Sequence, residues 1–97
     1  MALIQKEGSR LRVQGPMTVD TVNALLAETP QAFSAENLEV DLGEVSEVDS
    51  ASISLIFEWL RQAHRHNTSL VFVKLPASLV SLATLYGVLD LIPQHTH

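Results

Sequence analysis

Two short apolar segments at the start of the chain, separated by a turn sequence, predict a β-hairpin. Its strands are expected near Leu3–Lys6 and Leu11–Gln14, on either side of a Gly8-Ser9 turn. The pair Gly15-Pro16 follows directly, and because such pairs mark turns and loops, it is predicted to break the second strand.

Two later segments also have the composition of strands. Residues 37–42, "NLEVDL", alternate apolar and polar side chains, which is the pattern of a strand with one buried face. Residues 69–75, "SLVFVKL", are nearly all apolar through Leu70–Val73, as expected of a strand covered on both faces.

Helical periodicity predicts three helices, over about Thr18–Phe33, Ser50–His66 and Pro76–Gly87. Thr18 is the expected N-cap of the first helix, and Gly87 suits a left-handed cap at the end of the third. The tail "VLDLIPQHTH" is expected to add a short strand or strap. The residues predicted on the three inner faces are Val19, Val22 and Leu26 (or Leu25); Ile53, Ile56, Phe57, Leu60 and His64; and Leu79, Leu82, Ala83 and Tyr86.

The order of these elements, β-β-α-β-α-β-α, predicts the fold class. Single helices between the later strands imply right-handed crossovers and a sheet that is partly parallel. The sequence therefore predicts one α/β domain over residues 1–97, with a mixed, mostly parallel four-stranded sheet, an N-terminal hairpin and about three flanking helices.

Charge and composition exclude several classes of function. The net charge of −5 disfavours nonspecific nucleic-acid binding and anionic membrane surfaces, since both require basic residues. The chain has no cysteine, and it shows neither a signal-peptide pattern nor an apolar run long enough to insert in a membrane. A cytoplasmic protein is expected.

The segment "EVSEVDSASISLIFEWL" places Asp49 and Ser50 at the predicted start of the second helix. Either side chain can accept a hydrogen bond from the first backbone N–H groups of that helix, so a simple N-cap accounts for one of them. Ser52 and Ser54 crowd the same turn, which is more than a cap requires.

Catalysis and metal binding are poorly supported. His64 lies about 21 Å along the helix from Ser50, whereas a nucleophile and its base must lie within about 3 Å. The pairs His64/His66 and His95/His97 are spaced i, i+2, and side chains at that spacing on a helix point apart. We therefore expect no enzyme activity, no cofactor and no metal.

Leu55 and Trp59 form an i, i+4 pair beside or behind the predicted core face, on the side that carries Ser52. Trp59 can fold over the edge of the core or pack against a neighbouring helix. Alternatively the pair is a docking surface, because exposed aromatic and leucine side chains commonly anchor protein partners.

The segment "LEVDLGEVSEVDSASISLIFEWLRQA" resembles the signature of STAS domains, named for sulphate transporters and anti-sigma factor antagonists. Gly15, the strand "SLVFVKL" and the ending "LATLYGVLDLIP" support the resemblance, which extends over nearly the whole chain. The resemblance implies a small α/β domain with a mixed sheet that acts as a protein-binding module of bacteria.

The family pattern implies a role for Ser50. In anti-sigma factor antagonists the hydroxyl residue directly after the aspartate is phosphorylated by a partner kinase, and this blocks docking. In the STAS subunit of Mla-type phospholipid ABC transporters, a threonine at this position contacts the ATPase subunit. The short chain and its ending look more like that subunit.

The resemblance thus implies two partners: a transporter ATPase, which would place the protein at the inner membrane through the complex, or an anti-sigma factor kinase that phosphorylates Ser50. Many members follow the hydroxyl residue with a small residue and glycine, where this chain has Ala51-Ser52, so Ser52 is expected to narrow the docking surface or alter the partner. The predicted partner-binding residues are Asp49, Ser50, Ala51, Ser52, Leu55 and Trp59.

Overall fold

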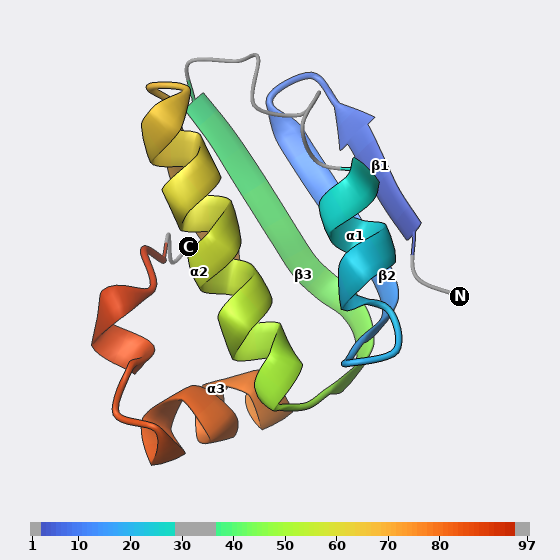
Figure 1. Cartoon of the computed structure of the whole chain (residues 1–97), viewed down its shortest axis with the longest axis vertical. Helices are drawn as coiled ribbons and strands as arrows, with labels where there is room; N and C mark the ends of the chain where they lie inside the picture. The colour runs from blue at the N-terminus through green and yellow to red at the C-terminus, as the bar shows by residue number, and fades with distance from the viewer. Residues whose placement is uncertain (1–2, 29–36, 95–97) are drawn as a thin grey trace.

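The structure, a computed structural model, describes residues 3–28 and 37–94 (Figure 1). Within them, the four predicted strands and three predicted helices occur in the predicted order. The strands are β1 (Leu3–Glu7), β2 (Arg10–Met17), β3 (Asn37–Val48) and β4 (Ser69–Val73). The helices are α1 (Val22–Glu28), α2 (Ser50–Arg65) and α3 (Ala77–Leu85), followed by the 3₁₀ helix η2 (Leu89–Leu91).

The strands form one mixed sheet in the order β1-β2-β3-β4. β1 and β2 pair antiparallel as a hairpin, whereas the β2–β3 and β3–β4 pairs are parallel. Helices α1 and α2 lie side by side over one face of this sheet, and α3 crosses near the start of α2 (Figure 1). The predicted α/β class and the mixed four-stranded sheet are therefore confirmed.

Strand β2 does not break at Gly15-Pro16, so that prediction was wrong. The strand continues to Met17, with irregularities in its pairing to β3 on both sides of Gly15. Gly15 has a φ of 86°, which glycine adopts without a steric penalty. A local bulge of this kind accommodates a proline in a strand, because the disrupted ladder does not need its missing N–H.

Helix α1 begins at Val22, later than predicted, because residues 18–21 form a turn. The N–H of Thr21 donates to the carbonyl of Thr18 at 3.0 Å. Val19 therefore lies on the surface, 66% exposed, and its predicted place on the inner face was wrong. Leu25 of this helix is fully buried. The end of the predicted helix, at residues 29–33, lies outside the described residues.

Helix α2 presents a different face to the core from the one predicted. Its buried residues are Ser52, Ile53, Leu55, Ile56, Trp59 and Ala63. Phe57 and Leu60 are only partly buried, and His64 is exposed. At 100° per residue, the centre of the buried face is displaced by roughly 90° from the predicted centre.

Trp59 explains this rotation. Its indole is 0% exposed and stacks on Phe72 of strand β4, with ring centroids 6.4 Å apart. Leu55, one turn earlier, is 1% exposed. The prediction that Leu55 and Trp59 form an exposed docking stripe was therefore wrong: both side chains lie in the core.

The C-terminal segment closes the outer edge of the sheet. Leu79 and Ala83 of α3 are buried as predicted, but Tyr86 is 51% exposed. Gly87 has a φ of 69°, so the left-handed cap is confirmed. Beyond η2, the N–H of Phe72 donates to the carbonyl of Pro93, and Gln94 forms a single parallel bridge to β4.

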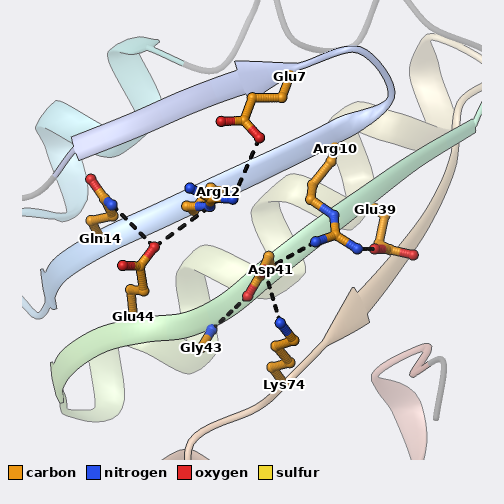
Figure 2. A network of polar contacts seen from close by, with 9 residues as sticks. All are labelled: Glu7, Arg10, Arg12, Gln14, Glu39, Asp41, Gly43, Glu44 and Lys74. Atoms are coloured by element: carbon orange, nitrogen blue, oxygen red, sulfur yellow. Dashed lines mark hydrogen bonds and ion pairs between the residues drawn. The ribbon is translucent and has the colours of Figure 1, made fainter. Parts of the chain in front are cut away.

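A network of ion pairs covers the sheet face turned away from α2 (Figure 2). The nearly buried Asp41 carboxylate accepts the N–H of Gly43 at 2.8 Å and lies 3.5 Å from Arg10 and 3.8 Å from Lys74. A side chain at Gly43 would meet the Asp41 and Lys74 side chains at 3.1 Å. Arg10 also pairs with Glu39, so these cations and carboxylates neutralise one another.

We expect Trp59→Ala to lower the free energy of unfolding by about 3–5 kcal/mol, because it removes a large buried side chain and leaves a cavity. Urea denaturation followed by circular dichroism measures the effect. Val19→Ala, at an exposed position, is the control and should change stability by less than about 0.5 kcal/mol. A loss below about 1 kcal/mol for Trp59→Ala would contradict the buried position of the indole.

Candidate functional site

The candidate site lies where strand β3 ends and helix α2 begins. Asp49 is the N-cap, with an extended backbone. Its Oδ1 accepts the N–H of Ala51 at 2.8 Å, and the Ser52 hydroxyl accepts the N–H of Asp49 at 3.1 Å. These reciprocal bonds form a capping box, which satisfies backbone groups that the helix itself leaves unpaired. Of the two capping residues considered, Asp49 is therefore the cap.

The same two side chains also hold the loop between β2 and α1. Oδ2 of Asp49 accepts the N–H of Val19 at 3.0 Å, across 30 residues of sequence. The hydroxyl of the fully buried Ser52 donates to the carbonyl of Met17. The start of α2 is therefore joined to the loop at Val19 and to the last residue of β2 at Met17.

Ser50 occupies the first helical position and is exposed. Within residues 3–28 and 37–94, no group forms a hydrogen bond with its hydroxyl. Because Asp49 performs the capping, the Ser50 hydroxyl stays available to an external group. The exposed Val19 belongs to the same part of the surface, since its backbone is bonded to Asp49.

A shallow groove of about 390 Å³ lies between α1 and α2, starting one helical turn after Ser50. Its lining residues are Val22, Leu26, Ser54, Leu55, Glu58 and Arg61. Arg61 pairs with Glu58 at 3.2 Å on the outer side of α2. The groove thus combines the partly buried Val22 and Leu26 and the buried Leu55 with a charged edge.

The predicted site residues fall into two groups. Asp49, Ser50 and Ala51 lie at or near the surface. Ser52, Leu55 and Trp59 are almost completely buried. Ser52 does not narrow a docking surface, because its hydroxyl is directed inward to Met17, so that part of the expectation was wrong. The other part, that Ser52 alters the choice of partner, stays a prediction.

Val19 is the surface residue that sequence reasoning missed. Two threonines precede helix α1, and either one suits an N-cap, but choosing Thr18 placed Val19 inside the protein. The helix starts after Thr21, whose hydroxyl bonds the backbone of Pro16 and Thr18. The second threonine was the signal for the alternative boundary.

The side chains around Ser50 are not arranged as a nucleophile with its base. Both carboxylate oxygens of Asp49 accept backbone N–H groups, so Asp49 is not placed to remove a proton from Ser50. His64 lies near the opposite end of α2. In the described part of the chain, no group of three or more histidine, aspartate or glutamate side chains could hold a metal ion. No described helix has the length and apolar character needed to cross a bilayer.

Comparison with known proteins identifies what this chain is similar to. Residues 2–93 match the family described as "Mlab, STAS domain". No curated protein matches the sequence.

Several solved structures share the fold at low sequence identity. The anti-sigma factor antagonist SpoIIAA in its unphosphorylated form aligns with a TM-score of 0.75 at 12% identity, covering 100% of this chain and 90% of that one. SpoIIAA of Bacillus in the phosphorylated form gives a TM-score of 0.68 at 11% identity, with coverages of 100% and 93%. An anti-sigma factor antagonist from Mycobacterium paratuberculosis gives 0.73 at 18% identity, with coverages of 100% and 86%.

We expect Asp49→Ala to lower the free energy of unfolding by about 0.5–2 kcal/mol, because it removes the N-cap of α2. Ser50→Ala should change stability by less than about 0.5 kcal/mol, since the exposed hydroxyl makes no bond to be lost. Thermal or urea unfolding of the two variants, side by side, measures the difference. A larger loss for Ser50→Ala than for Asp49→Ala would show that Ser50 is the cap.

Proposed function

The chain belongs to the STAS domain family, and on that basis we propose that it is a non-catalytic, protein-binding regulatory module that docks on a partner through the start of helix α2. The observation that carries the proposal is the Ser50 hydroxyl, which is exposed and makes no hydrogen bond within the described residues, on a turn that Asp49 and Ser52 hold in place.

The proposed docking surface, here termed the Ser50 surface, consists of Val19, Ser50, Ser54 and Arg61 together with the groove residues Val22 and Leu26. It replaces the predicted stripe of Leu55 and Trp59, which the core conceals. Apolar side chains at the centre with polar groups at the rim are typical of protein interfaces. At the edge of this surface, Glu58 is paired with Arg61.

The partner that we propose is the ATPase subunit of an Mla-type phospholipid ABC transporter. Two features support it. The family that matches this chain carries the description "Mlab, STAS domain", and the match covers residues 2–93. In addition, Ser50 occupies the position at which a hydroxyl residue of the Mla-type subunit meets its ATPase, as the sequence resemblance implies.

The alternative partner is an anti-sigma factor kinase, with Ser50 as the phosphorylated residue. The fold is shared with SpoIIAA, which is known in a phosphorylated and an unphosphorylated form. Phosphorylation would add about −1.5 to −2 charges beside the carboxylate of Asp49. The positive end of the helix dipole would tolerate this charge, so the domain would stay folded while the charge and shape of the Ser50 surface change.

We expect Ser50→Asp to weaken binding to the purified transporter ATPase by at least roughly tenfold, because it places an unpaired charge within the Ser50 surface. Isothermal titration calorimetry or surface plasmon resonance measures the affinity. Ser69→Asp is the matched control, since Ser69 is also exposed but lies in β4, next to the opposite end of α2. Equal affinities for the two variants would contradict the Ser50 surface.

The same wild-type domain distinguishes the two partner classes. An anti-sigma kinase encoded in the same genome, incubated with the domain and ATP, should leave Ser50 unmodified if the transporter assignment is right. Phosphate incorporation that is lost in Ser50→Ala, together with no binding to the transporter ATPase, would establish the alternative instead.

A further inference from the structure

The geometry points to a second role for Asp49: we propose that it is a positioning residue that latches the loop between β2 and α1 to helix α2, so that Val19 and Ser50 reach the partner as one preorganised surface. The latch itself is a property of this structure, and its importance for binding rests on the proposed function.

Hydrogen bonds of Thr21 close the loop on itself and tie it to the end of β2. The Thr21 hydroxyl accepts the N–H of Thr18 at 3.0 Å and donates to the carbonyl of Pro16 at 2.9 Å, while the Thr21 N–H closes the turn on Thr18. A turn closed in this way moves as a unit, so its position depends on where it is attached. The loop is attached to the start of α2 through the N–H of Val19, and the residue just before the loop, Met17, is held to the first turn of α2 through its carbonyl.

Asp49 carries more hydrogen-bonding capacity than a cap needs. Serine, threonine and asparagine cap helices about as well as aspartate, and each uses one oxygen. Asp49 uses Oδ1 for the N–H of Ala51 and Oδ2 for the N–H of Val19. The second bond adds nothing to the helix, since it is made to a different segment of the chain.

The location of the bond suits a function in recognition. Val19 is 66% exposed, so the core does not hold it, and Ser50 is the residue directly after Asp49. The latch therefore fixes the separation between an apolar and a hydroxyl side chain on the surface. A partner that contacts both side chains loses less entropy on binding when their geometry is already set.

The variant Asp49→Ser separates the latch from the cap. Serine supplies one capping oxygen but has no second oxygen for the loop. Hydrogen exchange measured by NMR should show the Val19 amide exchanging roughly tenfold faster, as expected for the loss of one hydrogen bond to a carboxylate. Asp49→Asn, which also keeps a single oxygen, should give the same result, and Ser50→Ala should leave the Val19 amide unchanged. An unchanged Val19 exchange rate in folded Asp49→Ser or Asp49→Asn would overturn the latch.

A double-mutant cycle tests whether the latch acts in binding. Val19 is the second residue of its turn, a position that proline favours, so Val19→Pro removes the N–H donor and keeps the turn. Val19→Ala keeps the donor and removes only the side chain. Asp49→Ser should lower affinity for the transporter ATPase by at least about fivefold in the wild-type and Val19→Ala backgrounds, and should have no further effect in Val19→Pro.

Two results separate failure of the latch from failure of the proposed function. If Asp49→Ser has the same effect on affinity in the Val19→Pro and Val19→Ala backgrounds, or none in either, Asp49 does not position the loop for binding. If the wild-type domain does not bind the ATPase at all, the proposed partner is wrong, and the exchange rate of the Val19 amide still decides whether the latch exists.

Discussion

The stacking of Trp59 on Phe72 fixes the rotation of helix α2 about its axis, and so decides which side chains at the candidate site face the solvent. At 100° per residue, Ser52 lies roughly 20° around the helix from Trp59, whereas Ser50 lies roughly 180° from it. Once the indole faces the sheet, Ser52 must point inward and Ser50 outward. Had the helix been turned to bury the predicted face, Ser50 would lie nearer the edge of the core and Trp59 would be exposed. The orientation of the candidate site therefore follows from packing in the core.

The free energy gained by burying the Trp59 ring exceeds the cost of leaving its N–H without a partner. The indole Nε1 is buried and has no hydrogen-bond partner among the described residues. An unsatisfied buried donor costs about 1–3 kcal/mol. Burying a tryptophan removes about 150–250 Å² from water, which contributes roughly 4–6 kcal/mol at about 25 cal/mol per Å². Burial of the ring outweighs the lost hydrogen bond, so the helix settles with its largest side chain on the sheet.

Polar side chains have different roles on the two faces of the sheet. On the face away from α2, Asp41 and its cationic neighbours satisfy one another and keep the surface charge balanced (Figure 2). On the helical face, Asp49 and Ser52 form hydrogen bonds that join the start of α2 to Val19 and Met17. The side chains of Ser50 and Val19 are exposed at that junction, on backbone segments that packing and hydrogen bonds hold in place. A recognition surface built on such supports keeps its geometry before a partner arrives.

Local features of the sequence determined the identity and order of the elements. The hairpin, the capped start of α2 at Asp49 and the left-handed Gly87 each depend on residues that are neighbours in the chain, so propensity and capping rules predict them. Three features depended on the tertiary structure: the path of β2 through Gly15-Pro16, the exposure of Val19 and the rotation of α2. Helix α2 carries apolar side chains around more than half of its circumference, because it contacts α1 and α3 as well as the sheet, so periodicity alone offers two candidate faces. The contact with Phe72 selects one of them. Phe72 lies on strand β4, so the pattern of residues within α2 cannot reveal this contact.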